Sequence, residues 1–400
     1  MKLFAPILLF LSSLSAEIYD VSIPENDTAS YNYADFRMWV NDSTDTLRGI
    51  YWFMHPNNGD SRNIVTDSTY QALVSEQDFA LMGAHIFNMH MNTGIGDAVI
   101  AAMDSFAVLF RHDELEFIPF FVNGYSWGGQ FGYHFTKWIP ERVVGFITQK
   151  GGYHDTTDAG DAIEVPGLMF IGENDLPYRI ENLTGIFLEH RPLGAKWILA
   201  MEQGTGHTQV TDYSFLNSFF NTITNLRLPD SVDVFQPIQL NTLPDTLGWV
   251  GDQNSWIIGS FDCYDGLIDS SSWFPSKNVG ERWQYFVSEG EVNDTSECDG
   301  SVGIDIRIHV PTDFLLYHPY PNPFNPSTTL RFNIPSNTTK PVLINIYDIA
   351  GSVVKTVIDE RIESGYHEIQ WNLTASSSGV YFVELRIGEK RLVQKLLFLK

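Results

Sequence analysis

One serine stands between glycines at the end of an apolar run, in the stretch FVNGYSWGGQFGYH over residues 121–134. The five residues around Ser126 read G-x-S-x-G, a pattern typical of a serine at a sharp turn from a strand into a helix. Such a turn strains the serine's backbone, so the residues two positions away must be small. The pattern predicts that Ser126 is a nucleophile and that the N–H of Trp127 faces a developing oxyanion. The alternative is a glycine-bracketed turn without chemistry.

Two later stretches carry the partners that a nucleophilic serine needs. The segment VPGLMFIGENDLPYR places Asp175 just past an apolar run, and WILAMEQGTGHTQV places His207 in a glycine-flanked loop. The order serine, aspartate, histidine is the order of the triad in an α/β hydrolase. Taken singly, Asp175 fits a helix cap, His207 fits an ordinary loop histidine, and Glu173 is a rival acid. Their joint positions at strand ends favour a Ser126–Asp175–His207 triad.

Other residues near these strand ends are candidates for binding the reacting group. A second oxyanion donor is expected from the segment YWFMHPNNGDSR. Pro56 has no N–H, so Asn57 is the expected donor and Asn58 the next choice. An Asn-Gly turn without a catalytic role is the alternative. In the segment KGGYH, Tyr153 and His154 are expected to line the substrate cleft.

The elements that must position these residues follow from the hydrophobic pattern. From residue 47 to 224, apolar runs alternate with amphipathic stretches, which predicts an α/β domain with a mostly parallel sheet and helices on both faces. Strands are expected over residues 50–54, 80–86, 117–122, 143–148, 167–171 and 197–201, and helices over residues 96–110, 126–138, 178–191 and 212–226. Ligands bind at the carboxyl ends of such strands. The candidate residues follow these ends.

The pattern changes in the last quarter of the chain. Alternating runs such as VLINIYDIAG and GVYFVELRIG, separated by glycine turns, predict a small antiparallel β-sandwich over residues 316–400. The resulting organisation is a signal peptide over residues 1–16, an α/β domain over 17–286, a linker over 287–315 and the sandwich. Residues 229–286 are expected to form an extension packed on the α/β domain.

Composition limits the partners. The net charge is −25, yet residues 316–400 hold nine basic and seven acidic residues, so the acidic excess lies in the rest of the chain. A strongly acidic domain repels phosphate backbones and anionic lipids, which argues against nucleic acid and membrane surfaces as partners.

The N-terminus indicates export. One lysine precedes the apolar stretch from Leu3 to Leu11, and small residues continue to Ala16, as in a secretory signal peptide that is cleaved near Ala16. The stretch is too short to span a bilayer, so we expect no transmembrane segment in the mature chain. Export exposes Cys263 and Cys298 to an oxidising space, where we expect a disulfide. Two unpaired thiols are the alternative.

The segments HPNNGDSR, GYSWGGQFGYHF and QKGGYH, together with Ser126, Asp175 and His207, resemble the secreted poly(3-hydroxybutyrate) depolymerase and feruloyl esterase-like group of α/β hydrolases. This resemblance covers roughly residues 18–286 and departs from the group at Pro56 and Asn57, where relatives commonly carry glycine. The segments YPNPFNPSTTLRF, INIYDIAGSVV, GYHEIQWN and SGVYFVEL resemble the C-terminal sorting domain of the type IX secretion system. This second resemblance implies that the protein is delivered through the periplasm and outer membrane to the cell surface or outside.

These features predict a secreted serine esterase that cleaves carboxylic esters, aryl or polymeric ones included, through an acyl-enzyme. Such a reaction requires no metal or organic cofactor, and no residues with metal-ligand spacing stand out in the sequence. Two alternatives remain: a prolyl oligopeptidase-like peptidase, which uses the same triad, and a non-catalytic surface protein on the same fold.

Overall fold

The computed structural model describes residues 17–25, 29–56, 59–229, 233, 235–290, 295–296, 315–316, 319, 324–334, 338, 340–362, 365–373, 378–388 and 390–400. The chain divides into two compact units, Met1–Asp299 and Gly300–Lys400, and each is described by itself. The predicted signal peptide over residues 1–16 and most of the predicted linker over 287–315 lie outside the described residues.

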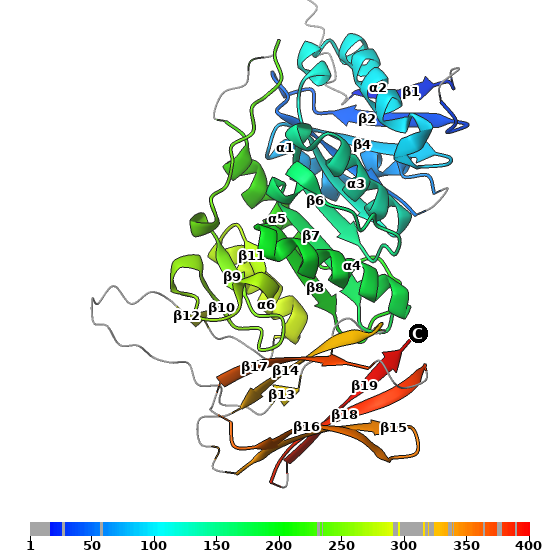
Figure 1. Ribbon diagram of the computed structural model, residues 1–400. Coiled ribbons are helices and arrows are strands. Elements are labelled where there is room, and N and C mark those ends of the chain that lie inside the picture. The colour runs from blue at the N-terminus through cyan, green and yellow to red at the C-terminus, as the bar shows by residue number, and fades with distance from the viewer. Residues whose placement is uncertain are drawn as a thin grey trace, which may run out of the picture. The chain divides into compact units, whose positions relative to one another are not determined.

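The first unit is built around a sheet that has eight strands within the described residues, in the order β1-β2-β4-β3-β5-β6-β7-β8 (Figure 1). Strand β2 is antiparallel to β1 and β4, and the neighbours from β4 to β8 are parallel. The strands are β1 (Glu17–Ile23), β2 (Ala34–Val40), β3 (Gly49–Met54), β4 (Phe79–Ile86), β5 (Phe120–Tyr125), β6 (Val143–Gln149), β7 (Gly167–Gly172) and β8 (Trp197–Glu202).

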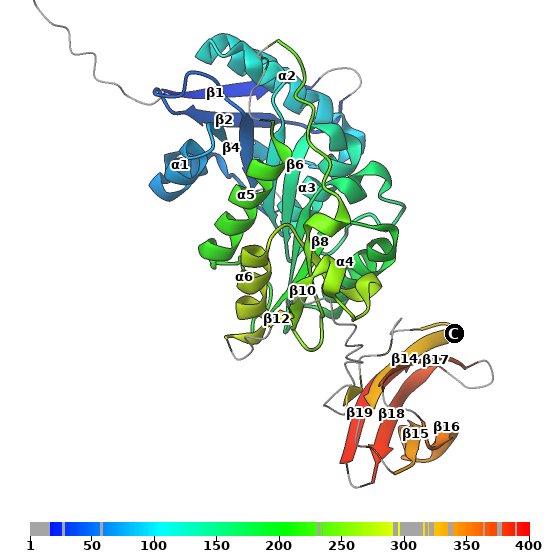
Figure 2. The ribbon, with the colours of Figure 1, turned by 90° about the vertical axis from the view of Figure 1, so that its left-hand side faces the viewer.

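Helices cover both faces of this sheet (Figure 2). One face packs against α2 (Ile95–Phe110), α3 (Trp127–Trp138) and α4 (Pro177–His190), and the other packs against α1 (Ser68–Ser75), α5 (Tyr213–Arg227) and α6 (Lys277–Ser288). Because both faces are covered, strands β3 and β5 to β7 are almost continuously buried, as parallel strands usually are.

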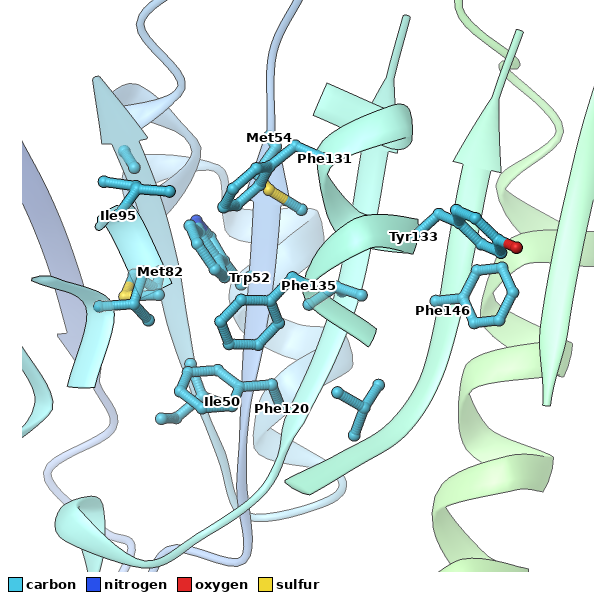
Figure 3. Packing of buried hydrophobic residues seen from close by; sticks show 14 of the residues in the cluster. Ile50, Trp52, Met54, Met82, Ile95, Phe120, Phe131, Tyr133, Phe135 and Phe146 are labelled. Carbon is cyan, nitrogen blue, oxygen red and sulfur yellow. The ribbon is translucent and has the colours of Figure 1, made fainter. Parts of the chain in front are cut away.

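Aromatic packing fixes α3 on the centre of the sheet (Figure 3). Trp52 of β3 meets Phe131 and Phe135 of α3 edge-on, with ring centroids 5.7 and 5.4 Å apart, and Phe135 also meets Phe120 of β5 at 5.3 Å. Burying one large apolar side chain contributes about 1.5–3 kcal/mol. This cluster therefore holds the start of α3 at a defined height above β3 and β5.

The α/β class predicted from the sequence is confirmed, and the six predicted strands and four predicted helices are present. The predicted strand over 117–122 begins later, at Phe120, because a 3₁₀ helix at Asp113–Glu116 and Pro119 precede it. The pattern missed β1, β2, α1 and α6. Strand β1 is the antiparallel edge of the sheet and β2 lies between it and β4. Both lack the continuous apolar runs of the central strands, although residues 34–38 of β2 alternate in burial as a half-buried strand does.

Residues after α5 add a small sheet to this unit, in the order β11-β9-β10-β12. Its strands are β9 (Trp249–Gly251), β10 (Ile258–Ser260), β11 (Ser272–Phe274) and β12 (Thr295–Ser296). Trp273 of β11 and Trp283 of α6 belong to the same buried cluster as Ile198 of β8. The indole N–H of Trp283 donates a hydrogen bond to the Leu199 carbonyl at 2.7 Å. The extension thus shares the core of the α/β domain.

The described part of the second unit is all β. Within its described residues, one sheet has the order β13-β14-β17 and the other β16-β15-β18-β19, with antiparallel pairing throughout. Leu330, Phe332, Ile344, Val383 and Leu385 from the two sheets share one buried core. This confirms the predicted small β-sandwich. The strands are β13 (Leu315–Leu316), β14 (Ser327–Ile334), β15 (Val342–Asp348), β16 (Val353–Glu360), β17 (Gly365–Asn372), β18 (Gly379–Ile387) and β19 (Lys390–Phe398).

Candidate active site

Ser126 lies at the turn between the end of β5 and the start of α3. Its φ of 57° and ψ of −120° are rare for a residue other than glycine, at a cost of about 1–3 kcal/mol. The Ser126 N–H donates to the Gln149 carbonyl at the end of β6, at 2.7 Å. This bond ties the strained turn to the neighbouring strand. The serine hydroxyl is thereby presented at the carboxyl end of the sheet, the geometry that G-x-S-x-G favours.

Two glycines make this turn possible. A Cβ on Gly124 would lie 2.2 Å from the carbonyl carbon of Gly128, and a Cβ on Gly128 would lie 2.5 Å from the carbonyl oxygen of His55. No side chain fits at such distances. The pair therefore lets the first turn of α3 pass directly over β5 and beside the end of β3.

The structure brings Ser126, His207 and Asp175 together. The Oγ of Ser126 lies 2.8 Å from Nε2 of His207, and Nδ1 of the same ring lies 2.9 Å from Oδ2 of Asp175. Asp175 follows β7 and His207 follows β8, so three strand ends contribute one side chain each. The three residues form the hydrogen-bonded chain in which a base removes the serine proton and an acid orients the base.

The environment of Asp175 keeps its carboxylate charged. The side chain is 1% exposed, and Oδ1 accepts hydrogen bonds from the Leu176 N–H at 2.7 Å and from Nη1 of Arg179 at 2.9 Å. Burial raises the pKa of Asp175, but the hydrogen bonds from His207, Arg179 and the Leu176 N–H outweigh it and hold the pKa below its ordinary value. An anion at this position stabilises a protonated His207.

The loop that carries His207 is held partly by the elbow itself. The hydroxyl of Tyr125, the residue before Ser126, donates to the His207 carbonyl at 2.7 Å. The two rings also lie 5.2 Å apart at 34°. Tyr125 therefore restrains both the backbone and the ring of His207 from the nucleophile's side.

Both predicted oxyanion donors stay predictions, and only Trp127 lies in the described part of the chain. Trp127 is the first residue of α3, where an N–H has no acceptor within the helix and can face a developing negative charge. Its indole donates to the Met89 carbonyl at 3.1 Å, which holds the side chain aside. Asn57 and its alternative Asn58 lie outside the described residues, so the second donor stays a prediction.

Tyr153, one of the two predicted substrate contacts, is 65% exposed and stacks on Tyr178 at the start of α4, with centroids 5.1 Å apart and planes 29° apart. The guanidinium of Arg179 lies 5.3 Å from the Tyr178 ring and also bonds to Asp175. The two exposed rings therefore lie beside the candidate acid as a flat aromatic surface, which we call the tyrosine pair.

His154, the other predicted substrate contact, is buried. Its Nε2 lies 2.8 Å from Oγ1 of Thr148 and its Nδ1 lies 3.2 Å from Oδ1 of Asn182. Burial lowers its pKa to about 3, so the ring is neutral. With both nitrogens engaged and 3% of its surface exposed, His154 supports the loop after β6 from beneath, and we do not retain it as a substrate contact.

The rival acid Glu173 has another partner. Its Oε2 accepts the Gly204 N–H at 2.7 Å. Glu173 thus supports the loop before His207, whereas the carboxylate that bonds to the His207 ring is that of Asp175.

The contacts that Arg179 and Tyr125 make with Asp175 and His207 were not predicted from the sequence. A cation four residues after Asp175 at a helix start was a usable signal for Arg179. Nothing in the sequence pointed to the Tyr125 hydroxyl.

The predicted disulfide falls partly outside the described residues. Cys263 ends a short 3₁₀ helix, Phe261–Cys263, and is disulfide-bonded. Cys298 is not among the described residues. The pairing of Cys263 with Cys298 stays a prediction.

The described part of the chain holds neither a candidate metal site nor a candidate membrane-spanning helix. It contains no group of three or more His, Cys, Asp or Glu side chains placed to hold a metal ion. Among the described helices, none combines the length and the apolarity that crossing a bilayer requires.

The strand order, the elbow after β5 and the partners after β7 and β8 define the class: the first unit has the α/β-hydrolase fold. Residues 318–399 match the family model described as "Secretion system C-terminal sorting domain". The chain thus combines an α/β-hydrolase domain with a sorting domain of the type IX secretion system, which indicates export to the cell surface or beyond.

Comparison with solved structures gives distant similarities. The fluorophosphonate-binding serine hydrolase FphF of Staphylococcus aureus is 11% identical, with a TM-score of 0.38 over 52% of this chain and 97% of that chain. For an S-formylglutathione hydrolase of Agrobacterium tumefaciens the values are 13%, 0.41, 54% and 96%. For the feruloyl esterase module of Clostridium thermocellum, determined as an S954A mutant, they are 10%, 0.36, 49% and 83%. No curated protein matches the chain. These TM-scores are below 0.5, so the fold assignment rests on the topology.

Proposed function

We propose that this protein is an exported serine esterase that hydrolyses carboxylic esters through an acyl-enzyme on Ser126. One observation carries the proposal. The hydroxyl of Ser126, the ring of His207 and the carboxylate of Asp175 form a continuous chain of hydrogen bonds of 2.8 and 2.9 Å on a strained elbow. A turn without chemistry has no need for a strained serine aimed at an oriented imidazole.

In the proposed reaction, His207 takes the proton of Ser126 as Oγ attacks the ester carbonyl carbon. Asp175 holds the ring and stabilises its positive form. The tetrahedral oxyanion accepts a hydrogen bond from the Trp127 N–H, with Asn57 as the expected second donor. His207 then donates its proton to the leaving alcohol oxygen as the C–O bond breaks. One side-chain donor in a comparable hole contributes about 3–4 kcal/mol.

The acyl-enzyme is resolved by water. His207 removes a proton from a water molecule, whose oxygen attacks the acyl carbonyl, and then returns the proton to Oγ of Ser126 as the carboxylic acid leaves. All groups required for both half-reactions belong to the chain or to the solvent.

The substrates we propose are aryl or polymeric esters. The segment between β6 and β7, residues 150–166, is fully described and holds no element longer than the 3₁₀ helix Gly160–Glu164. It is too short for a helical lid. The tyrosine pair offers flat aromatic surface beside the triad for the ring or chain outside the reacting bond.

A fluorophosphonate probe tests the proposal. It should label wild-type protein on the peptide that contains Ser126, and Ser126→Ala should abolish labelling while lowering kcat on a short aryl ester at least about a thousandfold. Circular dichroism and thermal unfolding serve as folding controls. A folded Ser126→Ala variant with undiminished activity would refute the nucleophile.

A further inference from the structure

A buried lysine follows β6, one residue after the carbonyl that anchors the elbow. The side chain of Lys150 is 0% exposed, and its φ of 52° is unusual for a residue other than glycine. A buried ammonium is costly unless it is fully paired, and a strained backbone persists only where its surroundings hold it. Burying the ammonium and holding the backbone at a positive φ both cost free energy, so contacts around Lys150 must hold it in place.

The three side-chain partners of Lys150 lie at the end of β8 and in the loop that follows it. The ammonium donates to the carboxylate of Glu202, to Oγ1 of Thr205 at 3.0 Å and to Oγ1 of Thr208 at 3.1 Å. An ammonium has three N–H donors, so these acceptors use its full capacity. Thr205 and Thr208 stand on either side of His207. Lys150 therefore holds the chain by hydrogen bonds on both sides of His207, the candidate base.

The loop needs such support, because residues 203–212, between β8 and α5, form no helix or strand. Neighbouring segments add contacts to those of Tyr125 and Glu173 described above. Oε1 of Gln149 at the end of β6 accepts the Val210 N–H at 3.0 Å, and the Thr205 carbonyl accepts the N–H of Asn174, which follows β7, at 2.8 Å. With Lys150, these bonds replace the regular backbone ladder that would otherwise define the position of His207.

We infer that Lys150 is a positioning residue: its ammonium clamps the segment from Glu202 to Thr208, so that Nε2 of His207 stays within hydrogen-bond distance of Ser126. This inference rests on the proposed esterase function. Lys150 takes no part in proton transfer and acts through His207. A loosened base lowers kcat, because a displacement of about 1 Å reduces a rate by about a hundredfold. Binding of a substrate outside the reacting centre is unaffected.

A second buried lysine provides the matched control. The side chain of Lys196 is 5% exposed and pairs with Asp245, and it also donates to the Gly194 carbonyl at 3.1 Å. None of these partners belongs to the loop of His207. Replacing either lysine by methionine leaves a carboxylate without its cation, so both variants test the general cost of a broken ion pair, and only Lys150→Met tests the clamp.

The experiment compares Lys150→Met, Thr208→Val and Lys196→Met in the full chain. On a short aryl ester, Lys150→Met should lower kcat by about 30- to 100-fold with KM within about twofold, and Thr208→Val by about 3- to 10-fold. Lys196→Met should keep kcat within about threefold. Thr208→Val decides the matter if Lys150→Met fails to fold. Unchanged kcat in the folded clamp variants would overturn the inference.

A double-mutant cycle separates positioning from a general structural role. In a His207→Ala background the clamp has no base left to position, so Lys150→Met should cost less than about twofold. A second full 30-fold loss there would assign the effect to the fold as a whole.

Hydrogen exchange gives an answer that does not depend on activity. The peptide over residues 203–212 should exchange at least about tenfold faster in Lys150→Met, and at the wild-type rate in Lys196→Met. Unchanged exchange in Lys150→Met would reject the clamp whatever the kinetics show. A loosened loop in a protein whose wild type hydrolyses no ester would reject the esterase function and leave the clamp standing.

Discussion

At the scale of single residues, His207 differs in its surroundings from two other histidines of the first unit, His154 and His134. His207 is 25% exposed and lies between a hydroxyl and a carboxylate. His154 is buried among neutral partners, and His134 accepts the Asp155 N–H at 2.8 Å. Burial lowers the pKa of His134 to about 4 and that of His154 to about 3. The same side chain is thus available for proton transfer in one place and held neutral in the other two.

These two neutral histidines predict acid sensitivity. Their ordinary pKa is near 6.5, so between pH 6.5 and about 4 the unfolded chain binds more protons than the folded one. The free energy of unfolding should therefore fall as the pH is lowered through this window. The contribution of each histidine reaches at most about 1.4 kcal/mol per pH unit.

Urea unfolding between pH 7.5 and 4.5 measures this slope. His154→Gln cannot titrate, so its unfolding free energy should depend less steeply on pH than that of the wild type. The lowered pKa of Asp175 acts only near and below its ordinary value of 3.8 and does not contribute in this window. Equal slopes in the two proteins would contradict the buried neutral state of His154.

At the scale of elements, the loop after β6 and the start of α4 carry the tyrosine pair. The loop supplies Tyr153 and α4 supplies Tyr178, and the two rings are 65% and 38% exposed. Large aromatic rings usually lose most of their exposure on folding. This exposure is the reason for proposing the tyrosine pair as a substrate contact.

Tyr153→Ala should therefore weaken the binding of aryl esters. We expect KM for a feruloyl or phenyl ester to rise about 3- to 10-fold, from the loss of about 0.5–1.5 kcal/mol of aromatic contact, with kcat little changed. A small alkyl ester should be hydrolysed as by the wild type. Tyr285 of α6, also 65% exposed, is the matched control. Equal effects of Tyr153→Ala and Tyr285→Ala would argue against an aromatic subsite.

The short connection between β6 and β7 predicts how the proposed esterase acts on lipids. Without a helical lid there, no conformational opening should be needed at an oil–water interface. We expect hydrolysis of soluble short esters, no activation at the interface and little action on long-chain triglyceride. Titration of released acid over a range of substrate concentrations across the solubility limit measures this. Faster hydrolysis of emulsified triglyceride than of every soluble ester would exclude the open site.

At the scale of the whole molecule, the chain forms two units, each with its own buried core. The core of the first unit is formed by residues up to Val287, and the core of the second is formed by residues from Leu316 onward. The candidate triad lies entirely in the first unit, and the match to the sorting domain lies entirely in the second. We therefore propose that the first unit carries the chemistry and that the second serves delivery.

Truncation after Thr312 tests this division. The purified protein should retain its rate of ester hydrolysis within about twofold, because each core is built from its own unit. In the native host the same truncation should abolish display at the cell surface or release. A truncated protein that stays folded and loses hydrolysis of polymeric esters alone would make the second unit a substrate-binding module.

The sequence by itself determined the class of the fold and the three strand ends that are followed by Ser126, Asp175 and His207. Buried runs alternate with amphipathic helices strongly enough to reveal a parallel sheet, and G-x-S-x-G around Ser126 reports a local steric demand that only small residues meet. The same local logic found the separate period-two pattern after residue 315. Strands β1 and β2 were missed, although the alternation of buried Ala34, Phe36 and Met38 with Asp35 and Arg37 in β2 was a usable period-two signal.

Only the tertiary structure decided which side chains meet. The neutral state of His154 depends on its burial by surrounding segments, and the charge of Asp175 depends on hydrogen bonds from His207, Arg179 and the backbone. The hydrogen bonds from Lys150 to Thr205 and Thr208 join residues more than fifty positions apart in the sequence. Local sequence records propensity and period, whereas burial and hydrogen-bond partners are set by segments that approach one another only after the sheet has formed.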